Sequence, residues 1–373
     1  MITDKGALLL IGAGTSLQFG LPSGERLFEE ILIQLGIELR EPKTPKIINK
    51  IQQACVYNEF YFVPGGKKLA ILPAIAHVSK FDAHKTIEIA RSVYARMNNQ
   101  TSETIDDFIF QNPDISLAVK LCVATCIFNS LYKWDNSAST FRLSNLESRQ
   151  LKVGGNVERN WVHLLINIVR EGVRNGATSP ENKVKIVTFN YDMVLEYILD
   201  GQFSNVSNTI IPDDSSWQDY IEVAHVHGKF NGMVPTIQKP YALISKWAYS
   251  FVVIHQTDGL EKIQDERETA VQLVLEARKY FASGFSFSAS NVELIKLVAP
   301  NSRGSIDIHY ANYDGNVGLR TALDRLKTSQ AYDSVRQKWI PFNVRVHPTD
   351  GTPEKPMSAV DWFRAGIPGR PPS

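Results

Sequence analysis

Residues 8–14 read LLLIGAG, and this stretch decides the fold class of the chain. Four consecutive apolar residues, Leu8 to Ile11, are typical of a strand that is buried on both faces, as strands are in parallel sheets. A glycine turn ends the apolar run, and a helical pattern with its apolar residues on one side follows from about residue 24. A strand that passes through a glycine turn into a helix is the opening unit of a doubly wound α/β sheet.

The rest of the chain alternates strand and helix signals in the same way. Further strands are expected at 185–189, at 221–226, in the segment that ends at 284–286 and at 305–310, and a long helix at about 260–281. Residues 36–180 carry mostly helical patterns. We therefore predict an α/β fold: a doubly wound, Rossmann-like parallel sheet with a large, mainly helical insertion. Its expected parts are a core at 1–35 and 181–330, the insertion at 36–180, and a proline-rich C-terminal arm at 331–373.

Composition narrows the classes of function. The chain has 373 residues, of which 43% are hydrophobic, and a formal net charge of +1. A charge this small favours neither nucleic acid nor an anionic membrane surface as a general partner. Three cysteines are too few for a four-cysteine zinc site or a disulfide framework, so no bound metal is expected. The sequence shows no signal peptide and no stretch that approaches the length of a transmembrane helix, so we expect a cytoplasmic protein.

The glycine turn is a weak functional signal by itself. The dehydrogenase fingerprint G-x-G-x-x-G would need glycine at position 17, where this chain has Leu17, and the phosphate-loop pattern is absent. A tight turn at the end of a strand is the alternative interpretation. Gly12 and Gly14 would nevertheless let the backbone approach a phosphate closely, with the amides of the following helix pointing at it.

Two later segments add polar side chains at strand ends. The first reads TFNYD, from Thr188 to Asp192, where a strand gives way to a helix. Ligands of α/β sheets bind at this edge, although Asn190 could be only a turn residue and Asp192 only a helix cap.

The second segment reads HVHG, from His225 to Gly228. The two histidines are expected to point to opposite faces, so that at most one of them would face a given cleft. His227, beside the conformationally permissive Gly228, is the predicted member of the site.

Together these segments resemble the sirtuin family. GAGTS followed by GLP resembles the sirtuin signature G-A-G-x-S-x-x-x-G-[IL]-P, TFNYD resembles T-Q-N-x-D, and the HG pair resembles the sirtuin pair whose histidine is the catalytic base. The segment GFSF at 284–287 is similar to a later motif of the bacterial sirtuin-like branch, and Asn312 follows the last strand, where the family has an asparagine near the cofactor. The resemblance implies the catalytic residues Asn190, Asp192 and His227. It also implies NAD+-binding residues at Gly12, Ala13, Gly14, Ser16, Pro22, Thr188, Gly228, Gly284, Ser286 and Asn312.

The departures from the sirtuin pattern point to one branch of the family. The zinc ribbon of the deacylases would need more cysteines, Phe189 replaces the glutamine of T-Q-N-x-D, and an arginine follows the GLP triplet later than in the deacylases. These features are similar to the sirtuin-like effectors of anti-phage defence, which deplete NAD+ in an abortive infection. About 60 residues follow the similar region, which is too short for a typical sensor domain. This implies a stand-alone subunit that partners a HerA-like hexameric ATPase, with no membrane partner and no indicated nucleic-acid binding.

A homo-oligomer is expected as well, because such an activity must be controlled and the chain shows no recognisable sensor of its own. Its apolar helical stripe consists of Ile115, Val119, Cys122, Val123 and Ile127. Most of the stripe is expected to be the core of the insertion, and part of it could serve an interface between copies.

The expected chemistry is cleavage of the nicotinamide–ribose bond, which gives nicotinamide and ADP-ribose. Asn190 could position water or the ribose hydroxyls, Asp192 would favour the developing cation, and His227 could accept a proton at neutral pH. Two alternatives stay open: a sirtuin-type protein deacylase or ADP-ribosyltransferase that uses the same pocket, and an inactive assembly subunit that kept the fold.

Overall fold

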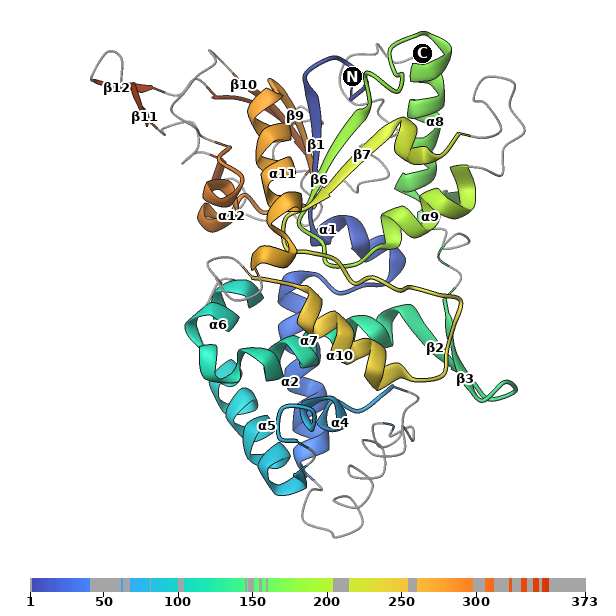
Figure 1. Ribbon diagram of the computed structural model, residues 1–373, viewed down its shortest axis with the longest axis vertical. Helices are drawn as coiled ribbons and strands as arrows, with labels where there is room; N and C mark the ends of the chain where they lie inside the picture. The colour runs from blue at the N-terminus through green and yellow to red at the C-terminus, as the bar shows by residue number, and fades with distance from the viewer. Residues whose placement is uncertain are drawn as a thin grey trace.

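A computed structural model describes most of the chain in two halves, a sheet with its covering helices and a bundle of helices below it (Figure 1). It describes residues 2–40, 62, 68–80, 82–99, 104–144, 146, 151–153, 156–158, 160–203, 215–253, 260–297, 306–311, 322–323, 330–333, 338–341 and 344–348. The first glycine turn and the short helix α1 (Ala13–Ser16) lie where the two halves meet.

The sheet half contains six parallel strands in the order β13-β10-β9-β1-β6-β7. They are β1 (Ala7–Ile11), β6 (Val184–Thr188), β7 (Ile221–His225), β9 (Lys279–Ser283), β10 (Ile306–Ala311) and β13 (Val344–Pro348). From β1 the chain builds outward through β6 and β7, then returns to the other side of β1 and builds outward through β9, β10 and β13. This is the doubly wound Rossmann order, and it confirms the predicted fold class. The order reverses between β1 and β9, so the crevice at the carboxyl edge of the sheet lies between these two strands.

The apolar run that opens the chain is buried on both faces of this sheet. Leu8 and Leu10 pack toward one face and Leu9 and Ile11 toward the other, because successive side chains of a strand alternate. Helices α8 (Trp161–Arg174) and α9 (Val194–Phe203) cover the face of Leu9, while α11 (Gln264–Glu276) and α12 (Ala289–Leu294) cover the face of Leu8. A single strand thus contributes to the cores of both layers.

The helical half is built around α7 (Ser116–Leu131), which is buried along most of its length. The helices that pack around it are α2 (Gly24–Arg40), α4 (Leu72–Ile75), α5 (Ala83–Asn98), α6 (Ile105–Gln111) and α10 (Pro240–Ser250). The stretch Pro113–Leu131 is long and apolar enough to span a membrane, contrary to the expectation that no segment approaches that length. Most of it is buried inside the molecule against its neighbours.

Four details differ from the sequence prediction. Helix α8 lies within the predicted insertion but packs against α9 in the sheet half, and α10 lies within the predicted core but packs against α7 in the helical half. The helix expected at 260–281 ends at Glu276, and residues 279–283 form the central strand β9 instead. Residues 344–348 of the predicted arm form β13, an edge strand of the sheet, because they pair in parallel with β10.

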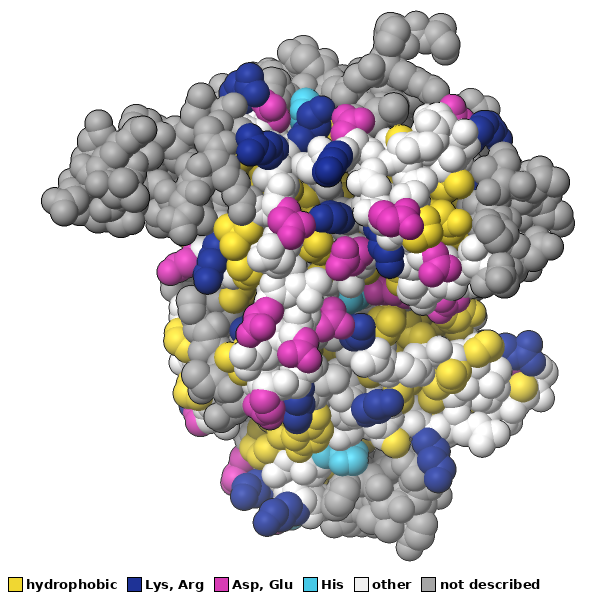
Figure 2. Space-filling model, turned by 45° about the horizontal axis from the view of Figure 1, so that its top comes forward, with side chains coloured by type: hydrophobic (Ala, Val, Ile, Leu, Met, Phe, Trp, Pro, Cys, Tyr) yellow, Lys and Arg dark blue, Asp and Glu magenta, His cyan; other side chains and the backbone are white. Residues whose placement is uncertain are grey.

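Short strands form small antiparallel sheets outside the main one. They are β2 (Tyr132–Asp135), β3 (Thr140–Leu143) and β8 (Thr236–Ile237) in one group, β4 (Leu151–Val153) with β5 (Asn156–Glu158), and β11 (Gln330–Asp333) with β12 (Lys338–Pro341). Figure 2 shows basic and acidic side chains intermingled over the described part of the face it presents, which agrees with the small net charge of the chain.

Candidate functional site

Two glycine turns meet at the crevice between β1 and β9. The amide of Gly12 donates to the carbonyl of Ser283 (3.1 Å) and the amide of Gly14 to the carbonyl of Gly284 (3.3 Å). A Cβ atom on Gly12 would lie 2.4 Å from the oxygen of Gly284, and one on Gly14 would lie 2.6 Å from its Cα atom. Gly284 itself has a φ of +63°, and Ala13 between the first two glycines is exposed. Glycine is therefore required here so that two backbone segments can touch.

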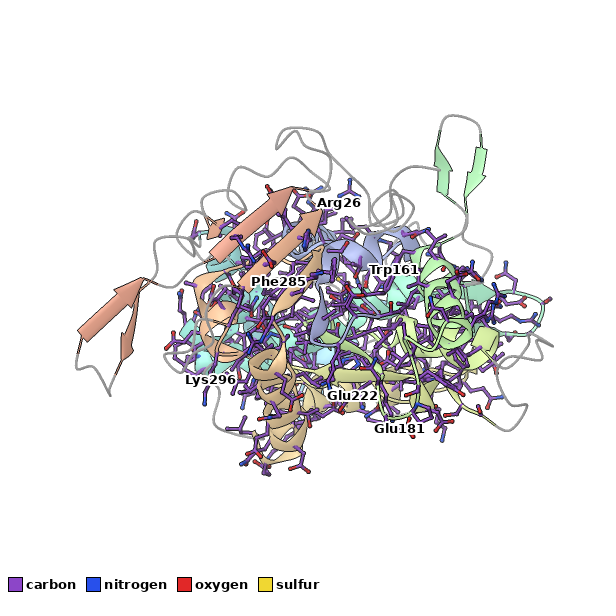
Figure 3. All side chains as sticks on the ribbon, turned by 90° about the horizontal axis from the view of Figure 1, so that it is seen from above. Arg26, Trp161, Glu181, Glu222, Phe285 and Lys296 are labelled. Carbon is purple, nitrogen blue, oxygen red and sulfur yellow. The ribbon has the colours of Figure 1, made fainter. Side chains whose placement is uncertain are left out.

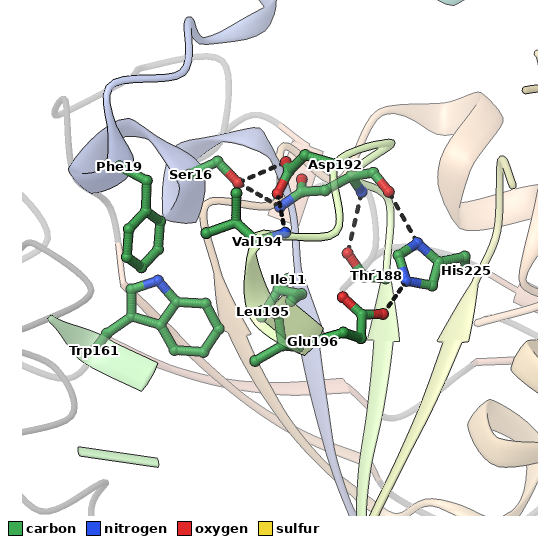
Figure 4. A pocket seen from close by; sticks show the side chains of 11 residues that line it. Ile11, Ser16, Phe19, Trp161, Thr188, Asp192, Val194, Leu195, Glu196 and His225 are labelled. Carbon is green, nitrogen blue, oxygen red and sulfur yellow. Dashed lines mark hydrogen bonds and ion pairs between the residues drawn. The ribbon is translucent and has the colours of Figure 1, made fainter. Parts of the chain in front are cut away.

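A buried polar network joins the turn after β1 to the loop after β6 (Figure 4). The Ser16 hydroxyl donates to Oδ2 of Asp192 (2.9 Å) and accepts a hydrogen bond from Nδ2 of Asn190 (2.9 Å). Nδ2 of Asn190 also donates to the Thr15 hydroxyl (3.3 Å), while Oδ1 of Asp192 accepts from the amide of Val194 at the start of α9 (3.1 Å). Asp192 is thus a helix cap, as one interpretation of the sequence expected, and also an anchor for Ser16. Burial raises the pKa of Asp192, which its hydrogen bonds oppose.

This network borders a small cavity. Its lining residues are Ile11, Ser16, Phe19, Trp161, Thr188, Asn190, Asp192, Val194, Leu195, Glu196 and His225. The cavity leaves room for about one water molecule. Two buried acceptors on its wall, Oδ1 of Asn190 and Oε2 of Glu196, have no hydrogen-bond partner among the described residues. Unsatisfied buried acceptors are uncommon, and these two could accept hydrogen bonds from a ligand or a water molecule.

His225 is held as an imidazolium between two acceptors. Its Nδ1 atom lies 3.1 Å from the carbonyl oxygen of Asn190, and its Nε2 atom contacts Oε1 of Glu196 on α9. A carbonyl and a carboxylate can only accept, so only the doubly protonated ring satisfies both. Burial lowers the pKa of His225, but the charge and hydrogen bond of Glu196 outweigh it, and the net shift is upward. A protonated ring with both nitrogens engaged cannot serve as a base.

His227 has different surroundings. Its ring lies 5.7 Å from the Phe189 ring and 5.8 Å from the Tyr191 ring, beside the side chain of Asn291. Its Nδ1 atom has no hydrogen-bond partner in the described part of the chain, and burial lowers its pKa. The two histidines thus separate as expected, but not by strand alternation, because residues two apart on a strand share a face. They separate because β7 ends at His225 and the chain then leaves the sheet.

The remaining sequence-predicted residues are spread along the same edge of the sheet. Thr188 lines the cavity, and its hydroxyl accepts a hydrogen bond from the backbone amide of Asn190 (3.1 Å). Gly228 has a φ of +77°, and a Cβ atom there would lie 2.6 Å from a backbone oxygen, so its conformation and packing both require glycine. Pro22 is half-buried before α2, Ser286 is exposed after β9, and neither lines the cavity; Asn312 lies outside the described residues.

Sequence reasoning missed several residues that build the site. Glu196 and Phe19 gave no local signal, and His225 was passed over in favour of its neighbour. Trp161 comes from the predicted insertion, yet its indole donates to the carbonyl of Thr15 (3.0 Å). Figure 3, a view from above, labels Trp161 and Phe285. Only the folded chain brings Trp161 next to the first glycine turn.

No protein-family model matches this chain, and no curated protein matches it significantly. Its function is therefore inferred from its own residues and their geometry. Within the described ranges, no group of three or more His, Cys, Asp or Glu side chains is placed to hold a metal ion.

Proposed function

We propose that this protein is a sirtuin-like NAD+ glycohydrolase, which cleaves the nicotinamide–ribose bond of NAD+ to give nicotinamide and ADP-ribose. One observation carries the proposal: the turns that follow β1, β6 and β7 meet at the carboxyl edge of a sheet with the Rossmann strand order. Dinucleotides bind across the crevice at the switch point of such sheets, where this chain has Gly12, Gly14 and Gly284.

The residues of this edge fit the requirements of the reaction. Oδ1 of Asn190 is a buried acceptor without a protein partner, suited to a water molecule or a ribose hydroxyl. His227 has a lowered pKa and an unpartnered ring nitrogen, so it is neutral at pH 7 and can accept a proton. Asp192 would hold Ser16 and Asn190 in place and stabilise positive charge on the ribose if it is ionised. The described cavity is too small for a nicotinamide ring, so the dinucleotide would lie outside it, along the turns.

The test is product analysis with NAD+. The purified protein should release nicotinamide and ADP-ribose, and Asn190→Ala and His227→Ala should each reduce the rate by about 100-fold or more. His84→Ala is the matched control, because His84 is exposed on α5, far along the chain from this edge. Circular dichroism and thermal unfolding would establish that the variants fold. Release of O-acetyl-ADP-ribose only with an acetylated peptide would favour the deacylase, and full turnover by both variants would refute the site.

As part of the same proposal, the enzyme is an effector that depletes NAD+ during phage infection and partners a HerA-like hexameric ATPase. An NAD+ hydrolase without control would harm its host, so its activity needs a gate, by which we mean a contact that keeps the enzyme inactive until infection. The apolar stripe of Ile115 and of Val119, Cys122 and Ile127 on α7 is not available for such control, because these side chains are buried within the molecule.

We further propose that the chain forms a homo-oligomer and that the gate lies in contacts between protein chains. Light scattering of the purified protein should give a mass of at least two chains. A concentration-independent monomer with full activity would contradict both the assembly and the gate.

A further inference from the structure

A buried tyrosine of the candidate site contacts the helical half. The Tyr191 hydroxyl donates to Oδ1 of Asp106, which lies in the first turn of α6. Tyr191 is the residue between Asn190 and Asp192, and only 8% of it is exposed. A carboxylate from the helical half therefore holds the middle of the loop that carries two of the proposed catalytic residues.

The Tyr191 ring is packed on several sides. It lies 4.6 Å from the Phe251 ring and 5.8 Å from the Phe230 ring, with which it stacks, and 5.8 Å from the ring of His227. Burial first, and then the charge of Asp106, raise the pKa of Tyr191, so the phenol stays neutral and remains a donor. The hydroxyl contact thus fixes the rotation of a ring that borders His227.

We infer that Asp106 is a positioning residue of the candidate site: through Tyr191 it holds the loop of Asn190 and the ring of His227 in their working arrangement, and so couples the helical half to the sheet edge. The inference rests on the proposed function for its catalytic consequence, whereas the contact itself can be tested without activity. Asp106 is not proposed to touch substrate.

The charges around His227 make this role measurable. Burial lowers the pKa of His227, the negative charge of Asp106 on α6 opposes that shift, and the positive charge of Arg267 on α11 adds to it. Uncharged groups beside the ring include Tyr191, Asn291 and the ring of Phe189.

Two cations near Asp106 are tied to backbone carbonyls. Lys120 on α7, whose pKa burial lowers to about 8, donates to the carbonyl of Phe251 (2.8 Å). The guanidinium of Arg267 donates to the carbonyl of Val226 (2.9 Å) and to those of Val252 and Val253 (3.2 Å each). Both cations keep their charge, and the charge of Asp106 still opposes the lowering of the His227 pKa.

Asp106→Asn and Tyr191→Phe test the inference, first through activity. Each should lower kcat/KM by about 10-fold, mainly through kcat. The double variant should be no worse than Tyr191→Phe, because Phe removes the donor of the contact and Asn replaces its charged acceptor by a weaker, neutral one. Since His227 acts when neutral, loss of the Asp106 charge should also move the acid limb of the pH profile of kcat/KM to lower pH. Tyr191→Phe keeps that charge and should not move the limb downward.

Asp107→Asn is the matched control. It removes a charge from the same turn of α6, but Asp107 bonds the Thr104 hydroxyl (2.8 Å) and not Tyr191. Its turnover and pH profile should equal those of the wild type. Full turnover of Asp106→Asn and Tyr191→Phe, or losses that multiply to about 100-fold in the double variant, would overturn the inference.

A second measurement separates this inference from the proposed function. Urea unfolding of the wild type, Asp106→Asn, Tyr191→Phe and the double variant should show coupling between Asp106 and Tyr191. The double variant should lose less unfolding free energy than the two single variants lose together. If the unfolding energies show coupling between Asp106 and Tyr191 but the wild type does not cleave NAD+, the proposed function is refuted and the contact stands. Additive unfolding energies in an active enzyme would refute the inference and leave the function intact.

Discussion

At the scale of single residues, neighbours decide what each histidine can do. His225 and His227 are two positions apart and both buried, yet one faces two acceptors and the other faces aromatic rings. The pKa of the first is raised by the charge and hydrogen bond of Glu196, which oppose burial; the pKa of the second is lowered by burial. Consequently His225 should contribute to stability and His227 to chemistry.

Removal of the His225 ring should destabilise the fold. His225→Ala leaves the buried Glu196 carboxylate without its partner, and we expect a loss of about 3–5 kcal/mol in the free energy of unfolding. The double variant His225→Leu/Glu196→Leu removes both charges and should recover most of that loss. Urea denaturation measures both. A loss below about 1 kcal/mol for His225→Ala would show that the pair is not a buried ion pair.

The same pair predicts a pH dependence. The pKa of His225 is raised above its ordinary value of 6.5, so its contribution is complete below about pH 6.5. It is lost as the pH rises through the raised value, because the folded state then releases its extra proton. The unfolding free energy of the wild type should therefore fall on the alkaline side relative to that of the double leucine variant. Parallel pH curves for the two proteins would contradict this assignment.

At the scale of elements, the turns after β1 and β9 act as one unit. Each glycine approaches the other turn more closely than a Cβ atom would allow. The glycines of LLLIGAG are therefore needed for backbone packing, whether or not a phosphate also lies there. A substitution at Gly14 tests the fold first and ligand binding second.

Gly14→Ala should destabilise the protein by about 1–3 kcal/mol, because its methyl group would overlap the Gly284 backbone. Gly24→Ala is the control: nothing lies within 4 Å of a Cβ atom there, and Gly24 opens helix α2. It should be neutral or stabilising by up to about 1 kcal/mol. Chemical denaturation compares the two, and equal effects would mean that the turns do not touch in solution.

At the scale of the whole molecule, segments that are distant in the sequence build each half. Strand β13 is the edge strand on one side of the sheet, although it lies in the proline-rich part of the chain. Ile308 of β10 is paired with Val346 of β13. Helices α8 and α10 each pack in the half opposite to the one that their positions in the chain suggest. The sheet edge with the candidate site is therefore supported by residues from nearly the whole length of the chain.

Truncation can measure the contribution of the last strand. A chain that ends at Pro341 lacks β13, whereas one that ends at Pro348 keeps it. We expect the shorter chain to be less stable than the longer one by roughly 3 kcal/mol or more, because β10 loses the hydrogen-bonded ladder on its outer side. Urea midpoints of the two truncated chains give the comparison. Equal midpoints would show that β13 is not an integral strand.

The sequence by itself determined the class of the fold and the edge at which to look for a site. A strand buried on both faces, glycine turns and period-3.6 helices are local patterns. They identified four of the six strands of the sheet, predicted β9 a few residues late, and placed Asn190, Asp192 and both histidines at strand ends. Only the tertiary structure decided what those residues contact. Contacts such as Trp161 with Thr15, Glu196 with His225, and Asp106 with Tyr191 join elements whose approach depends on the winding of the sheet and the packing of helices, which no local periodicity records. Protonation follows from these contacts, and for that reason the separate roles of His225 and His227 became visible only in the folded molecule.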